Sequence, residues 1–103
     1  MNAPLLILYT RSGCCLCEGL EQRLKDIPLQ DLSPPMNLEV IDIDRSDLST
    51  SEMKNYDLRV PVMVLFFKES NLRIEIPRVS PRIKQKELFQ WLQKVITKLV
   101  VLN

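Results

Sequence analysis

The segment that most constrains the fold is an apolar run near the start of the chain that changes directly into a helical pattern. Leu5–Tyr9 is continuously apolar, which is typical of a central strand buried on both faces. The apolar residues that follow recur at intervals of four, four and three, which predicts one stripe of an amphipathic helix. This stripe consists of Leu16, Leu20, Leu24 and Ile27. A strand that feeds into a helix favours parallel pairing with the next strand through a right-handed crossover.

The rest of the chain continues this alternation of strands and helices. Strands are expected at 38–43, 60–67 and 72–76, the last two as a hairpin, and a short helix is expected at 46–56. A final helix is expected to begin at Ser80, its N-cap, with Pro81 in the first helical position. Its apolar stripe consists of Leu88, Trp91, Leu92, Val95, Ile96 and Leu99. We therefore expect a single α/β domain over 1–103, a mixed four-stranded sheet covered by three helices in the order β-α-β-α-β-β-α.

Histidine is absent and glycine occurs twice, which removes several classes of chemistry. Without histidine there is no Ser-His-Asp triad, no Cys-His dyad and no His-ligated metal. Two glycines exclude a glycine-rich phosphate loop. The formal net charge of +1 gives none of the positive field expected of a nucleic-acid or anionic-membrane binder. Any chemistry must therefore come from cysteine, carboxylate, arginine, lysine or backbone groups.

The first apolar run also bears on location. Leu5–Tyr9 is too short for the core of a signal peptide, it lacks a basic leader, and no segment approaches the length of a membrane span. We therefore expect a cytoplasmic protein that does not bind membranes. In that reducing compartment, clustered cysteines are more often catalytic or metal-binding than structural disulfides.

Three cysteines stand at the junction between the first strand and the first helix. Cys14 and Cys17 are three residues apart, so a helical first turn places them on one face within disulfide reach, whereas Cys15 points elsewhere. The helix N-terminus stabilises an anion at Cys14 and lowers the pKa of its thiol, and Arg11 adds to that field. We therefore assign Cys14 as the attacking thiolate and Cys17 as the resolving thiol of a disulfide exchange reaction.

Two other interpretations of the cysteine cluster remain open. Three thiolates favour zinc or an iron-sulfur centre, but one chain is a ligand short of the usual four, so a dimer would have to complete the set. The domain could also be an interaction module without catalysis. A cation site at Asp42, Asp44 and Asp47 is less favoured than strand-end and capping roles for these residues, and we expect no metal site in the monomer.

Three segments together resemble a known family: Tyr9–Cys17, Ile41–Asp44 and Arg59–Val62. The chain resembles a small glutaredoxin-like protein of the thioredoxin fold over nearly its whole length. This resemblance implies thiol-disulfide exchange with a protein or small-molecule disulfide, and regeneration by a thiol reductant or a reductase. It also implies that Pro61 is a cis-proline beside the cysteine pair, and that the Val60 backbone pairs with the cysteine segment of the substrate. We expect Arg11, Val60 and Pro61 to be the substrate-binding residues.

The sequence departs from the glutaredoxin pattern at three places. Cys15 and Leu16 replace the usual Pro-Tyr, and Arg59 replaces the threonine before Val-Pro. The segment 76–81 lacks the Gly-Gly and acidic residue that hold glutathione in the family. We therefore expect a monomer with no tightly bound cofactor, in which glutathione binding is an open alternative. Carboxylates of another substrate are potential ligands for Arg59, Arg78 and Arg82.

Overall fold

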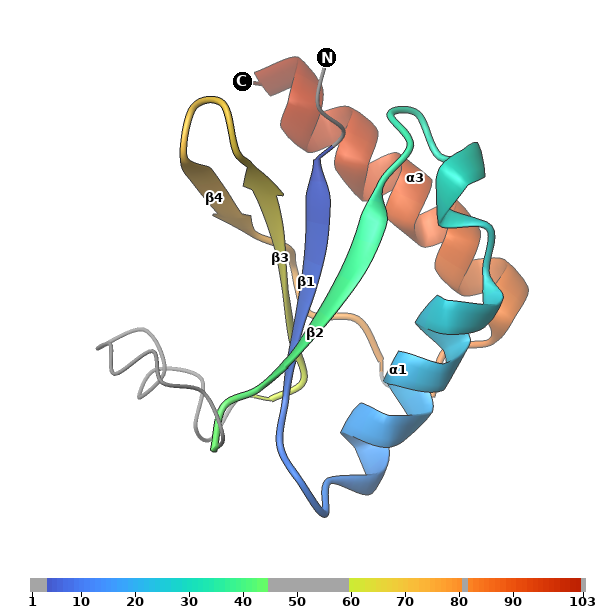
Figure 1. Cartoon of the computed structure of the whole chain (residues 1–103). Coiled ribbons are helices and arrows are strands. Elements are labelled where there is room, and N and C mark those ends of the chain that lie inside the picture. Colours follow the sequence, from blue (N-terminus) through green and yellow to red (C-terminus); the bar gives the residue numbers. More distant parts are fainter. Residues whose placement is uncertain (1–3, 45–59, 81, 103) are drawn as a thin grey trace.

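A four-stranded mixed sheet forms the centre of the protein (Figure 1). The computed structural model describes residues 4–44, 60–80 and 82–102. The strands lie in the order β2-β1-β3-β4, with β1 parallel to β2 and antiparallel to β3, and with β3 antiparallel to β4. They are β1 (Leu5–Thr10), β2 (Asn37–Asp42), β3 (Val62–Phe67) and β4 (Leu72–Glu75). The predicted mixed sheet with a terminal hairpin is confirmed.

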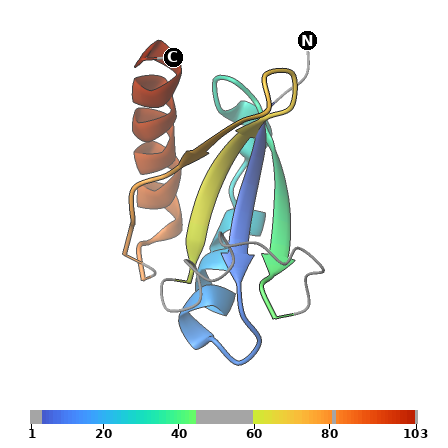
Figure 2. The same cartoon turned by 90° about the vertical axis from the view of Figure 1, so that its left-hand side faces the viewer.

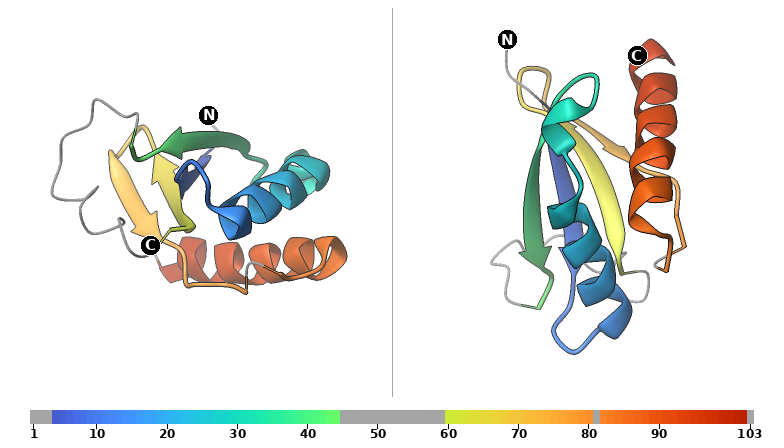
Figure 3. Two further views of the ribbon diagram at one scale, coloured as in Figure 1. Left: turned by 90° about the horizontal axis from the view of Figure 1, so that it is seen from below. Right: turned by 90° about the vertical axis from the view of Figure 1, so that its right-hand side faces the viewer.

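Within the described residues, two α-helices cover one face of this sheet. They are α1 (Cys15–Asp26) and α3 (Gln85–Leu102), and a short 3-10 turn, η1 (Leu29–Asp31), precedes β2. Figures 2 and 3 show α1 and α3 side by side on the same face. The helix predicted at 46–56 lies outside the described residues, so two of the three expected helices are described.

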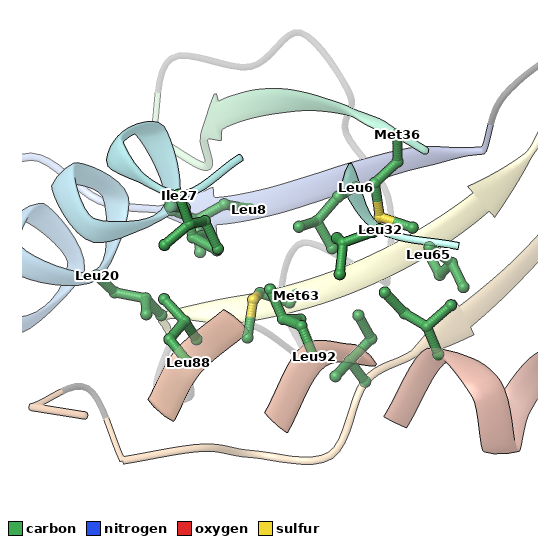
Figure 4. Close-up of a cluster of buried hydrophobic side chains, with 13 residues drawn as sticks. Leu6, Leu8, Leu20, Ile27, Leu32, Met36, Met63, Leu65, Leu88 and Leu92 are labelled. Atoms are coloured by element: carbon green, nitrogen blue, oxygen red, sulfur yellow. The ribbon is translucent and has the colours of Figure 1, made fainter. Parts of the chain in front are cut away.

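The main core fills the space between the sheet and these two helices (Figure 4). Alternate residues of β1 face opposite sides, because side chains along a strand alternate. Leu6 and Leu8 belong to the main core, whereas Ile7 and Tyr9 belong to a second buried cluster on the other face. The helices contribute Leu20 and Leu24 from α1 and Leu88, Leu92 and Ile96 from α3. β1 is therefore buried on both faces, as its continuous apolar run predicts.

The prediction that Leu16 belongs to the buried apolar stripe of α1 is wrong. Leu16 is 43% exposed, whereas Cys17 is fully buried and begins the inward face that continues through Leu20, Leu24 and Ile27. One residue corresponds to about 100° around a helix, so Cys17 in the stripe turns Leu16 outward. The buried position that the spacing assigned to a leucine is therefore held by a cysteine.

The predicted start of the last helix at Ser80 is also wrong, since α3 begins at Gln85. Ser80 instead begins a separate turn. Its carbonyl accepts the N–H of Ile83 at 3.0 Å, and its hydroxyl accepts the N–H of Arg82 at 3.3 Å. Ile83 then packs against the core, and the helical hydrogen bonding starts with the Leu88 N–H on the Lys84 carbonyl at 2.8 Å. A serine followed by proline suits a turn as well as a cap.

β3 begins two residues later than predicted. Its first residue is Val62 rather than Val60, which is consistent with the missing N–H of Pro61.

No helix within the described ranges is both long and apolar enough to cross a membrane.

Candidate functional site

A tight turn delivers the chain from β1 to the start of α1. The Cys14 N–H donates to the Arg11 carbonyl at 3.2 Å, and Gly13 in the third position of this turn has a φ of +81°. That conformation is characteristic of a type II turn, which favours glycine because an L side chain is strained there. Gly13 therefore allows the chain to reverse immediately before the cysteines.

Replacing Gly13 by alanine should destabilise the protein by roughly 1 to 2 kcal/mol, the usual cost of a left-handed L residue. No atom lies within 4 Å of the added Cβ, so the cost comes from the backbone alone. Gly19→Ala is the matched control. It lies inside α1, where alanine gains up to about 1 kcal/mol and only the Arg23 guanidinium, 3.3 Å from the new Cβ, must shift. Urea unfolding should show a lower free energy of unfolding for Gly13→Ala and a higher one for Gly19→Ala. Equal midpoints for Gly13→Ala and the parent would contradict the assigned turn.

Cys14 is the N-cap of α1. Its backbone is extended (φ −91°, ψ 102°), its carbonyl accepts the Glu18 N–H at 3.0 Å, and its Sγ accepts the Cys17 N–H at 3.1 Å. An N-cap side chain satisfies one of the backbone donors that the helix start leaves open, and the helix dipole places partial positive charge there. The sulfur of Cys14 therefore occupies a position that suits an anion.

Cys14 and Cys17 are joined by a disulfide, with their Cα atoms 5.2 Å apart. This is the pair that the spacing predicts. The two sulfurs differ in access, because Cys14 is half-buried and Cys17 is fully buried. Cys15 is a free, exposed cysteine next to them. An incoming sulfur can therefore reach Cys14 more easily than Cys17.

A group of four polar residues, here called the polar clasp, holds the turn against the end of β2. The Arg11 guanidinium makes two hydrogen bonds of 2.9 Å to the Asp44 carboxylate. Asp42 accepts the Asp44 backbone N–H at 2.8 Å and the Ser12 hydroxyl at 2.7 Å. Paired guanidinium-carboxylate bonds are directional as well as charged, so the clasp orients the turn. Arg11 thus pairs with Asp44, and its predicted action on the dithiol remains a prediction.

The Arg11 guanidinium lowers the pKa of Asp44 below its ordinary value of 3.8, first through the hydrogen bonds and further through its charge. A depressed pKa contributes stability that is present above pH 3.8 and is lost as the pH falls through the folded value. NMR titration of the Asp44 carboxyl should therefore give a midpoint below 3.8, and Arg11→Gln should return it toward that value. An ordinary midpoint in the parent protein would show that the ion pair does not persist in solution.

The other predicted substrate-binding residues lie at the start of β3. Pro61 is buried, Val60 is half-buried, and the peptide bond between them is cis. Pro61 lines a small cavity of about 80 Å³ together with Leu20 of α1 and the segment 75–79. Since Leu20 lies one turn beyond Cys17, Pro61 and the cysteine helix border the same space. Arg59 lies outside the described residues.

Within the described ranges, no three histidine, cysteine or acidic residues lie together in a way that could hold a metal ion. Asp42 and Asp44 are engaged in the polar clasp, and Asp47 lies outside the described residues. The sequence suggested strand-end or capping roles for both aspartates, with a cation site as the less favoured alternative, and did not predict the clasp. A signal was available in the order Arg11, Ser12 and Asp42, Asp44, because the ends of two adjacent parallel strands meet at one edge of the sheet.

Comparison with solved structures identifies the fold. The chain is similar to a protein described as a malarial protein, at a TM-score of 0.59 and 13% identity, covering 91% of this chain and 98% of that one. It is similar to the first thioredoxin domain of mouse protein disulfide-isomerase A4, at a TM-score of 0.62 and 17% identity, covering 93% of this chain and 63% of the other. It is also similar to G4, a poxviral disulfide oxidoreductase, at a TM-score of 0.50 and 10% identity, covering 86% of this chain and 90% of that one. These similarities establish a thioredoxin-like fold.

Comparison with protein-family models and with curated proteins shows to which family the chain belongs. No curated protein matches the chain. The family described as Glutaredoxin-like domain (DUF836) matches residues 5–93, which include the turn, all three cysteines, the start of β3 and the first half of α3. Because this match extends over most of the chain, the protein belongs to the glutaredoxin-like domain family.

Proposed function

We propose that the protein is a thiol-disulfide oxidoreductase that uses Cys14 and Cys17. In the reduced protein, the Cys14 thiolate attacks one sulfur of a substrate disulfide and forms a mixed disulfide, while the other substrate sulfur leaves as a thiolate. The Cys17 thiol then loses its proton and attacks Cys14 Sγ, which releases the second substrate thiol. Two electrons pass to the substrate and the protein becomes the Cys14–Cys17 disulfide. An external thiol reductant or reductase returns it to the dithiol.

The observation that carries this proposal is the unequal setting of the two sulfurs. Cys14 is half-buried at a helix N-cap and its Sγ accepts the Cys17 N–H at 3.1 Å, whereas Cys17 is fully buried. A backbone donor and the helix dipole favour the thiolate over the thiol, and this lowers the pKa of a cysteine in this position. Access and anion stabilisation thus coincide at Cys14, as a nucleophile requires.

We assign substrate binding to Val60 and Pro61, with Arg11 orienting the cysteine turn through the polar clasp. The cavity shared by Pro61 and Leu20 supports this assignment, because it places the start of β3 along the helix that carries the dithiol. Leu16 is 43% exposed between the cysteines and offers apolar contact to a polypeptide substrate. A reducing cytoplasm is the compartment in which an exposed free Cys15 is stable.

The test is disulfide reduction by the purified protein with two alternative electron sources, glutathione with its reductase and thioredoxin reductase with NADPH. We expect reduction of a protein disulfide with at least one of them, and absence of reduction with both would remove the proposal. The midpoint potential of the Cys14–Cys17 couple then gives the direction of transfer. Values near about −270 mV are typical of a reductant and values near about −120 mV of an oxidant.

A further inference from the structure

The connection between β4 and α3 is strongly basic. Residues 77–86 contain four cationic side chains and no acidic one, although the net charge of the whole chain is only +1. We call the described residues that precede α3, 77–80 and 82–84, the basic loop; its cationic residues are Arg78, Arg82 and Lys84. Positive charge is therefore concentrated in one short segment rather than spread over the surface.

The charges of the basic loop face water. Arg78, Arg82 and Lys84 are all exposed. Neither Arg82 nor Lys84 forms an ion pair with an acidic side chain of the described residues, in contrast to Arg11, which pairs with Asp44, and Lys25, which pairs with Glu21. At least two cations of the loop therefore have no acidic side chain in the described part of the chain that competes with a partner.

The basic loop borders the substrate-binding residues proposed above. Pro77, Arg78 and Val79 of the basic loop line the same cavity of about 80 Å³ as Pro61 and Leu20, together with Glu75 and Ile76 at the end of β4. Figure 3, seen from below, shows the light-orange connection beside the start of β3 and the helix that carries the cysteines. A substrate chain lying against Pro61 therefore has the basic loop as its neighbour.

We propose that the basic loop docks polypeptide substrates whose disulfide is flanked by acidic residues, an inference that rests on the proposed function. The loop presents successive cations along the chain, which match carboxylates spaced along an extended peptide. Electrostatic complementarity of this kind increases the association rate and selects among partners, and salt weakens it. The loop thus supplies selectivity on the side of the site where segment 76–81 lacks the glycine pair of the glutaredoxin pattern.

The experiment uses two synthetic peptides that contain the same disulfide, one flanked by aspartate and glutamate and the other by lysine. The acidic peptide should be reduced about tenfold more efficiently at low ionic strength, the low end of electrostatic steering, and the preference should disappear near 1 M salt. The double variant Arg82→Glu/Lys84→Glu should lose this preference through KM, with kcat retained. Lys68→Glu/Lys98→Glu is the matched control, because it changes the net charge by the same amount. Its two positions are in the β3–β4 turn and late in α3, at the far end of the molecule from the basic loop (Figure 1).

A binding measurement separates this inference from the proposed function. Fluorescence anisotropy with the same two peptides, carrying serine in place of cysteine, should give tighter binding of the acidic one, which Arg82→Glu/Lys84→Glu abolishes. Equal binding and equal reduction of both peptides would overturn the basic loop as a docking surface. Reduction of neither peptide together with selective binding would retain the surface and remove the oxidoreductase. An equal effect of the control variant would assign the preference to net charge and would also overturn the proposal.

Discussion

Replacing Cys14 by serine is expected to reduce disulfide reductase activity by on the order of 10³-fold or more, because a serine hydroxyl does not ionise near neutral pH and cannot replace the thiolate. The fold should survive, since Cys14 is only half-buried and serine is a favourable N-cap residue. Activity should be measured with the electron source that supports the parent protein, with the thermal midpoint of each reduced protein as the check on folding. Full activity in a folded Cys14→Ser protein would assign the nucleophile elsewhere.

The two other cysteines provide the controls. Cys17→Ser should retain the attack by Cys14 but lose the resolving step, so the mixed disulfide with substrate should accumulate and be visible as an added mass in intact mass spectrometry. Cys15→Ser should retain most of the activity, because Cys15 lies outside the disulfide and is exposed. Accumulation of the adduct in Cys15→Ser instead of Cys17→Ser would exchange the roles of these two residues.

The cysteine site was predictable because its determinants are local. The apolar run of β1, the two glycines near the cysteines and the three-residue spacing of Cys14 and Cys17 all act within fifteen residues. Local hydrogen bonding then sets the geometry, since Gly13 turns the chain and Cys14 caps the helix. The parallel pairing of β1 with β2 and the β3–β4 hairpin were predictable for a similar reason, because each joins strands that follow one another along the chain.

The polar clasp was not predictable to the same degree because it depends on distant residues. Arg11 and Asp44 are 33 positions apart, and either one alone is typical of a solvated loop. Only the parallel register of β1 and β2, which pairs Thr10 with Asp42, brings the two loop ends together. The late start of α3 has a similar origin, because the packing of Ile83 against the core overrides the capping pattern at Ser80.

Leu92→Ala is expected to have the largest effect on stability, a loss of about 2 to 5 kcal/mol in the free energy of unfolding. Leu92 is fully buried on the inner face of α3, in the cluster that joins this helix to the sheet and to α1 (Figure 4). Truncation removes three buried carbons and leaves a cavity that a close-packed core fills only in part. Since a domain of this size has a total stability of about 5 to 15 kcal/mol, the loss is a large fraction of it.

Leu72→Ala makes the same chemical change at a different depth and therefore isolates the contribution of burial. Leu72 of β4 is 37% exposed, so its truncation should cost less than about 1.5 kcal/mol, because much of the deleted surface is already in water. Urea unfolding of both variants and the parent, with unchanged m-values, measures the difference directly. Equal losses in the two variants would mean that α3 does not pack on the sheet as described. The larger loss in Leu92→Ala would confirm that the helix following the basic loop is anchored to the same core as the cysteine helix.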